Sequence, residues 1–147
     1  MTEHACPGDC RTLARIDEVS NSGAWSETAF YESVMNPSFA VIVYRDEEGE
    51  EPAGFIVCEF QGDLLAIDEI AVHPDRRRCG IASALLNVAA AEGIQRNCKE
   101  ITLEVRSGNA AAIAFYDNVG FQTAGVRKGL YKDPPDDAIV MMKKLTQ

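Results

Sequence analysis

Three arginines and a glycine stand between a hydrophobic stretch and a run of small apolar residues, in the segment Val72-His-Pro-Asp-Arg-Arg-Arg-Cys-Gly-Ile-Ala82. If a strand ends near Val72 and a helix begins near Gly80, the first backbone N–H groups of that helix are unpaired and carry partial positive charge. Such a helix start binds anions, and a glycine there lets a pyrophosphate approach the backbone closely. The arginines add fixed positive charge, although a basic run of this kind can also be merely a solvated turn.

The elements that must position this loop follow from the hydrophobic pattern. The pattern predicts helices over residues 9–20, from 26 onward, over 80–94 and over 109–118. It predicts strands over residues 39–44, 53–60, 64–72, 100–105, 120–127 and 138–145. Asp9, Ser26 and Asn109 are expected to cap their helices, and the helix over 80–94 is apolar on nearly every face and should be buried. An antiparallel meander followed by a β-α-β step predicts a mixed α/β sheet in a single domain, residues 1–147.

Charge is unevenly distributed along the chain. The net charge is −9, and residues 1–63 hold 13 acidic and 3 basic side chains, against 10 acidic and 11 basic in residues 64–147. The acidic turn over residues 46–51 is expected to be simply solvated. An acidic half attracts a cationic partner, whereas a more basic half tolerates an anionic one. We therefore do not expect nucleic acid as a direct partner.

The cysteines and the apolar runs argue against a disulfide-stabilised, a zinc-binding, a membrane-spanning or a secreted protein. Five scattered cysteines predict free thiols and no disulfide framework. His4, Cys6 and Cys10 lie close along the chain, but a structural zinc site needs a fourth ligand that is not apparent, so no metal is expected. No apolar run approaches the ~18–20 residues of a membrane helix, and the N-terminus lacks the pattern of a signal peptide. We expect a cytoplasmic protein with no membrane partner.

The loop also resembles a known motif. Arg77-Arg-Cys-Gly-Ile-Ala82 resembles the (Gln/Arg)-x-x-Gly-x-(Gly/Ala) motif of the GNAT family of N-acetyltransferases, and Ile70-Ala-Val-His-Pro74 resembles the family's usual lead-in. Residues 103–121, 25–30 and 137–141 are similar to the bacterial members that act on a ribosomal protein. This likeness extends over about residues 10–145. It implies a GNAT-like fold with a central acetyl-CoA cleft, in which the first strand, within residues 1–6, looks short or missing and the loop over 127–137 looks short.

The resemblance also implies an activity. It indicates an acetyl-CoA-dependent enzyme that acetylates the N-terminal alanine of a small-subunit ribosomal protein by direct transfer in a ternary complex. The expected partner is therefore a peptide or protein N-terminus, basic and ribosomal. Two alternatives stay open, namely acetylation of a small amine or of lysine side chains, and a non-catalytic sensor that binds acetyl-CoA.

Site residues follow from the same resemblance. The residues that it implies for the cofactor are Ile70, Ala71, Val72, Arg77, Arg78, Cys79, Gly80, Ile81, Ala82, Asn109 and Tyr116. A backbone N–H of Ile70 or Val72 would polarise the acetyl carbonyl oxygen. Glu104 is the implied general base, and Tyr116 the acid that serves the departing thiolate.

Glu69 is a rival for the role of base. Side chains alternate along a strand, so only one of Asp68 and Glu69 should face the cleft unless a β-bulge intervenes. The family fold has a bulge there, so the sequence does not rank Glu69 and Glu104. Glu69 is also expected to help bind the acceptor, together with Trp25, Tyr31 and Tyr131, whose rings would wall a groove for the first residues of a peptide.

Overall fold

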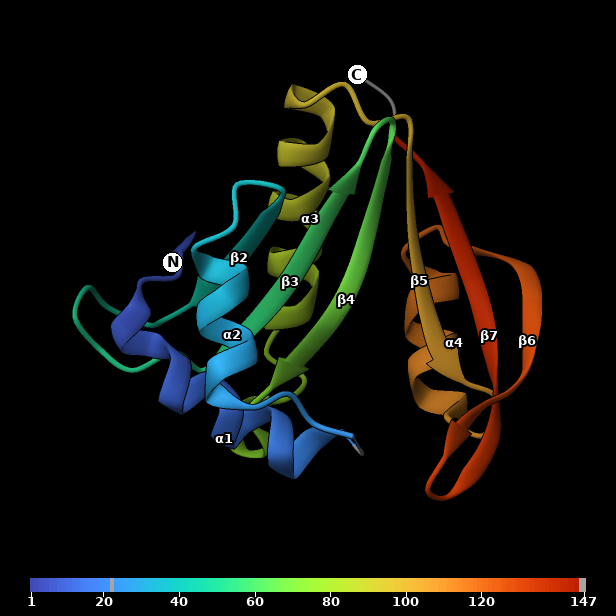
Figure 1. Cartoon of the computed structure of the whole chain (residues 1–147), viewed down its shortest axis with the longest axis horizontal. Helices are drawn as coiled ribbons and strands as arrows, with labels where there is room; N and C mark the ends of the chain where they lie inside the picture. The colour runs from blue at the N-terminus through green and yellow to red at the C-terminus, as the bar shows by residue number, and fades with distance from the viewer. Residues whose placement is uncertain (22, 146–147) are drawn as a thin grey trace.

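The computed structural model describes residues 1–21 and 23–145, and its centre is a seven-stranded sheet in the order β1-β2-β3-β4-β5-β7-β6 (Figure 1). The strands are β1 (Thr2–His4), β2 (Phe39–Tyr44), β3 (Gly54–Gln61), β4 (Leu64–Val72), β5 (Glu100–Arg106), β6 (Gln122–Lys132) and β7 (Pro135–Lys144). The helices are α1 (Cys10–Ser20), α2 (Glu27–Val34), α3 (Ile81–Gln95) and α4 (Ala110–Asn118), with short 3₁₀ turns η1 (Pro7–Asp9) and η2 (Pro74–Arg76). The predicted mixed α/β class is confirmed.

The first four strands form an antiparallel meander, as predicted. The first strand, expected to be short or missing, is present with three residues and pairs with β2 through Thr2 and Tyr44. Its neighbour β2 is buried over Ala40–Val43, because the inner strand of an α/β sheet is covered on both faces.

The change of direction comes between β4 and β5. Helix α3 joins them, and they pair in parallel, as the β-α-β step predicted. Their pairing covers only residues 64–66 of β4 and 100–102 of β5. Beyond these residues the two strands diverge, which splits the sheet into two arms (Figure 1).

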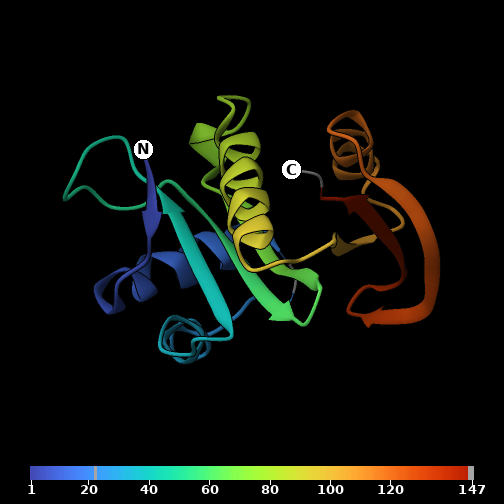
Figure 2. The same ribbon diagram turned by 90° about the horizontal axis from the view of Figure 1, so that it is seen from above.

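Helices cover both faces of the sheet, with α1 and α2 on one side and α3 and α4 on the other (Figure 2). Under α1 and α2, the ring of Phe30 meets that of Phe55 edge-on at 5.0 Å, and both side chains are fully buried. Complete burial of one such side chain contributes roughly 1.5–3 kcal/mol. Helix α3, which was expected to be buried, does bury Ile81, Leu85 and Leu86, but Asn87 on another face is exposed.

The hairpin of β6 and β7 differs from the prediction. Residues 127–137 were expected to form a loop, but β6 continues to Lys132 and β7 begins at Pro135. A register shift lies between Arg127 and Tyr131, and the Gly129 N–H donates to Asp137 Oδ1 at 2.8 Å. Most β6 side chains are exposed, so this strand carries no apolar alternation from which its length could be read.

The predicted helix caps are confirmed at two of three positions. Ser26 accepts a hydrogen bond from the Ala29 N–H at 3.1 Å, and Asn109 accepts one from the Ala112 N–H at 3.1 Å. Asp9 does precede α1, but its carboxylate caps no N–H group of that helix. This carboxylate binds Arg45 of the loop after β2 instead, at 2.9 Å, and both side chains are buried.

The cysteines and the N-terminal His4, Cys6 and Cys10 are placed as follows in the structure. All five cysteines are free thiols. His4 contacts Glu92, Cys6 lies beside Asp9 and Cys10 is buried, and within residues 1–21 and 23–145 no group of His, Cys, Asp and Glu could hold a metal ion. Among the helices of that described part, none is long and apolar enough to cross a membrane.

Candidate functional site

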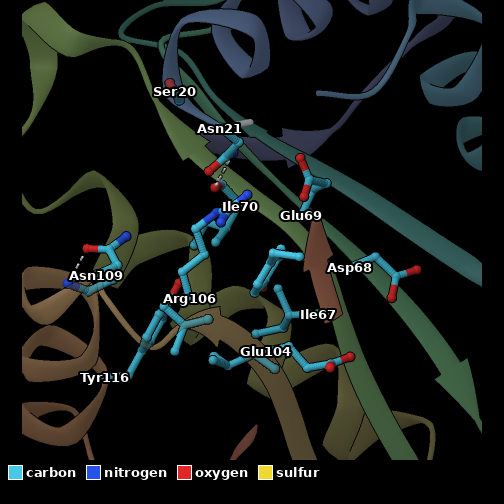
Figure 3. A pocket seen from close by; sticks show the side chains of 14 residues that line it. Ser20, Asn21, Ile67, Asp68, Glu69, Ile70, Glu104, Arg106, Asn109 and Tyr116 are labelled. Carbon is cyan, nitrogen blue, oxygen red and sulfur yellow. Dashed lines mark hydrogen bonds between the residues drawn. The ribbon is translucent and has the colours of Figure 1, made fainter. Parts of the chain in front are cut away.

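A cavity of about 430 Å³ opens where β4 and β5 diverge (Figure 3). Side chains from both strands line it, together with the end of α1, helix α4 and strand β6. The predicted site residues that it brings together are Glu69, Ile70, Glu104, Asn109, Tyr116 and Tyr131. Residues between 103 and 116 and residues 67 to 70 thus meet at one site, although the whole of α3 separates them in the sequence.

A β-bulge turns two successive carboxylic acids into the cavity. Glu69 pairs with Val57 of β3, whereas Ile67 pairs with the next residue, Cys58, so that Asp68 is left without a partner in the register. Figure 3 shows the two carboxyl groups leaving β4 in different directions, and both residues line the cavity. The alternation rule allowed this only with a bulge, and the bulge is present.

The two carboxyl groups on β4 are not ordinary acids. Burial, a hydrogen bond to Asp17 and the charges of Asp17 and Asp68 raise the pKa of Glu69 to about 9. Burial and a hydrogen bond to Glu59 raise the pKa of Asp68 to about 7. Desolvation disfavours the charged form of an acid, so Glu69 carries a proton at neutral pH and is poorly suited to accept another.

Glu104 lies across the cavity on β5 and is more accessible. Its side chain is 35% exposed, and Arg127 of β6 donates to both of its carboxylate oxygens, at 3.1 and 3.0 Å. An exposed pair of this kind contributes little stability. A solvated carboxylate at the edge of a cavity has the position that a general base requires.

Tyr116 closes the side of the cavity formed by α4. Its ring packs edge-on against Phe115 and Phe121, and the residue is 8% exposed. Burial, followed by the nearby charges of Glu69 and Tyr131, raises the pKa of Tyr116 to about 12. The hydroxyl group is therefore a hydrogen-bond donor throughout the physiological range.

The loop before α3 has the open helix start that the sequence predicted. Two of its residues adopt the left-handed conformation, Arg78 with φ 63° and Gly80 with φ 77°. Helix α3 begins at Ile81, and no side chain caps its first N–H groups. Space is also open beside Gly80, where an added Cβ would have no atom within 4 Å. An anion can therefore reach these N–H groups.

The three arginines of this loop are not equivalent. Arg76 forms a two-pronged ion pair with Asp46, one bond of which is 2.8 Å long. Arg77 donates to the Val72 carbonyl at 3.3 Å and to Ser20 Oγ at 3.2 Å. Arg78 is the one of these three that makes no hydrogen bond or ion pair with the residues that the structure describes, so its guanidinium is free to meet a ligand. The side chains of Ala71 and Ile81 are buried, which leaves only their backbones accessible to a ligand.

Two predicted acceptor residues do not reach the cavity. Trp25 packs against Phe30 with ring centroids 5.5 Å apart. Tyr31, 48% exposed on α2, lines a separate hollow beside η1. Tyr131 does line the cavity, with the Arg106 guanidinium 4.3 Å from its ring centroid.

Sequence reasoning missed two residues here. Arg106 lies two positions after Glu104, so strand alternation alone places both on one face. Asp17 sits four positions after Leu13, on the apolar face of α1, and both are fully buried. A carboxylate at such a position is rarely buried without partners, and that was a readable signal.

Known proteins resemble this chain in sequence and in structure. Residues 10–121 match the acetyltransferase (GNAT) family. The [ribosomal protein bS18]-alanine N-acetyltransferase of Escherichia coli K12 is 33% identical over 135 residues, which cover 90% of this chain and 89% of that protein. The crystal structure of the Escherichia coli ribosomal-protein-S18-alanine N-acetyltransferase superimposes with a TM-score of 0.88 and 29% identity, covering 100% of this chain and 94% of that one.

A more distant structure shares the fold. Arabidopsis thaliana NAA60 in complex with acetyl-CoA superimposes with a TM-score of 0.86 at 19% identity, covering 99% of this chain and 98% of that one. Together, the family match, the close relative and the shared fold identify the class of the protein. The chain belongs to the GNAT family and is an N-acetyltransferase.

Proposed function

We propose that residues 1–147 form a single domain that acetylates the N-terminal alanine of a small-subunit ribosomal protein in the cytoplasm, with acetyl-CoA as the donor. The observation that carries this proposal is the cavity between the diverging strands β4 and β5, which Glu104 and Tyr116 both line. The similarity to an enzyme that acts on the alanine of ribosomal protein bS18 supports the choice of acceptor.

The pyrophosphate of acetyl-CoA fits the start of α3. The backbone N–H groups of residues 79–82 would bind its oxygens, and Arg78 would supply charge. Asn109 at the cavity would contact the pantetheine arm, and a backbone N–H of Ile70 or Val72 would polarise the acetyl carbonyl oxygen. NAA60, which shares the fold, binds acetyl-CoA.

The reaction needs no covalent enzyme intermediate, because the thioester is already activated. The acceptor nitrogen attacks the acetyl carbon, the C–S bond breaks, and Glu104 takes the proton that the nitrogen loses. The pKa of Tyr116 is about 12, well above the ~8.5 of a thiol. Tyr116 therefore stabilises the departing sulfur mainly by donating a hydrogen bond. The acetyl group passes directly from the thioester to the amine, with both substrates bound in a ternary complex.

The walls of the cavity suggest a cationic acceptor. Asp68 and Glu104 line it as acidic groups, and Tyr131 offers an aromatic face beside them. The acidic N-terminal half would attract a basic peptide through long-range charge. Trp25 and Tyr31, which lie outside the cavity, would meet only acceptor residues further from the N-terminus.

The test uses acetyl-CoA with three acceptors: a basic alanine-led peptide, the same peptide with a blocked N-terminus and free lysines, and spermidine. Mass spectrometry locates the added acetyl group. Acetylation confined to the free N-terminus is the expected result. Modification of the blocked peptide or of spermidine would overturn the acceptor, and binding of acetyl-CoA without any transfer would favour a sensor.

Replacing Gly80 with alanine is expected to weaken acetyl-CoA binding by about tenfold, the loss of roughly one charge-assisted hydrogen bond. The new Cβ would stand where the pyrophosphate approaches, at a residue with φ 77°. Calorimetric titration with acetyl-CoA measures the effect. Gly62→Ala is the matched control, because Gly62 has φ 65°, is equally unobstructed and lies at the distant β3–β4 turn. Equal dissociation constants for the two variants would refute this placement of the pyrophosphate.

A further inference from the structure

Two carboxyl groups meet at the back of the cavity, Asp17 from α1 and Glu69 from β4. Asp17 has no solvent exposure. Its Oδ1 accepts a hydrogen bond from Asn21 Nδ2 at 2.6 Å, and its Oδ2 accepts one from the Trp25 backbone N–H at 2.8 Å. Both oxygens of Asp17 thus already accept from N–H donors, so the proton in a hydrogen bond between Asp17 and Glu69 comes from Glu69.

The contacts of Glu69 favour its protonated form. It forms a side-chain hydrogen bond with Asp17, and two carboxyl groups can share such a bond only when one of them carries a proton. Glu69 Oε2 is buried and has no hydrogen-bond partner among the described residues. A carboxylate there would leave a buried charge unpaired. The proton of this pair therefore lies on Glu69.

The other groups around Glu69 do not reverse this assignment. The titratable and charged groups that face it are Asp17 from α1, Asp68 from β4, Tyr116 from α4 and Tyr131 from β6. Glu104 and Arg106 of β5 line the same cavity, and the Arg106 guanidinium lies over the Tyr131 ring. Burial is the largest cause of the raised pKa of Glu69, and Asp17 is the next.

We propose that Asp17 is a positioning residue for acetyl transfer, which keeps Glu69 neutral beside the acceptor nitrogen so that Glu104 alone serves as the base. The inference rests on the proposed function. A second carboxylate beside the acceptor would raise the pKa of its ammonium group and hold the proton on the nitrogen. An ammonium group has no lone pair with which to attack the thioester. A neutral Glu69 lines the cavity and leaves the amine free to react.

Asp17→Asn tests this directly. The asparagine can still accept from the Trp25 N–H, but it donates an N–H to Glu69 and removes the neighbouring charge. The pKa of Glu69 should therefore fall from about 9, although burial still raises it, and its carboxylate form becomes populated at lower pH than in the wild type. The acceptor KM should fall, because the ammonium form binds better. The value of kcat should fall about tenfold, as for an amine whose pKa rises by about one unit, and its rise with pH should move to higher pH.

The double variant separates this role from a structural one. In Asp17→Asn/Glu69→Gln, residue 69 is again uncharged, so kcat and its pH profile should return toward those of the wild type. If Asp17 merely holds the loop through Asn21 and Trp25, the acceptor KM should rise in Asp17→Asn and the second substitution should rescue nothing. That outcome would overturn the proposal.

Infrared spectroscopy gives a readout that needs no turnover. At a pH between the pKa values of Asp68, about 7, and Glu69, about 9, the wild type should show the C=O stretch of a protonated carboxylic acid. Glu69→Gln should lack this band, and in Asp17→Asn the band should disappear at a lower pH than in the wild type. If the wild type lacks this band, Glu69 is not protonated and the proposal is wrong, even if the enzyme acetylates its peptide. If the band is present, the protonated Glu69 is supported even if the acceptor is another amine.

Discussion

Glu104→Gln is expected to lower kcat for peptide acetylation by about 10²- to 10⁴-fold, the usual range for loss of a general base. The amide cannot take the proton from the acceptor nitrogen, although it keeps the size of the side chain and can still accept from Arg127. Binding of acetyl-CoA should change little, because the start of α3 is untouched. Steady-state kinetics with the alanine-led peptide measure the effect.

The pH profile sharpens that test. A peptide α-amine has a pKa near 8, so at higher pH the acceptor arrives already neutral and the deficit of Glu104→Gln should shrink. Glu100→Gln is the matched control, since Glu100 lies on the same strand and outside the cavity, and it should keep wild-type kinetics. Equal rates for the two variants at neutral pH would show that the amine proton leaves by another route.

Arg45→Met is expected to lower the free energy of unfolding by about 3–5 kcal/mol, the usual cost of removing one partner from a buried ion pair. Arg45 and Asp9 are each 6% exposed. Arg45 donates to both Asp9 oxygens, at 3.1 and 2.9 Å, and to the Glu50 carbonyl at 2.8 Å. Without the guanidinium, Asp9 is a buried charge with only the nearby Cys6 groups as donors.

The pH dependence of this loss has a definite sign. Burial alone would raise the pKa of Asp9, but Arg45 and Cys6 outweigh it and lower the pKa below its ordinary value. In the wild type the pair therefore stabilises the fold at neutral pH, and its contribution is lost as the pH falls through the lowered pKa. In Arg45→Met, burial should raise the pKa of Asp9, so the deficit should narrow as the pH is lowered.

Urea denaturation at neutral and mildly acidic pH measures both effects. Arg11→Met is the control, because Arg11 meets Glu27 at 3.5 Å in an exposed pair and its loss should cost only a small fraction as much. Equal stabilities for the two variants would show that Arg45 contributes no more than a surface charge.

The sequence alone determined the class of the fold and the family. Hydrophobic periodicity is local, so it located the strands of the meander and the helix after Gly80 to within a few residues. The caps at Ser26 and Asn109 were readable for the same reason, since a side chain and an N–H three residues away make the bond. The pattern predicted a strand over residues 120–127 but missed the extension of β6 to Lys132, because the exposed side chains there carry no periodic signal.

Tertiary structure alone decided the chemistry of the acids. Asp17 and Glu69 meet only because α1 packs beside β4, and Asp9 meets Arg45 across 36 positions of the chain. Whether Asp68 and Glu69 share a cavity depended on one unpaired residue in the β3–β4 register. The proton affinity of an acid is set by burial and by neighbours that are distant in the sequence. The sequence could therefore name Glu69 and Glu104 as candidate bases. Only the folded structure indicates that Glu69 already holds its proton.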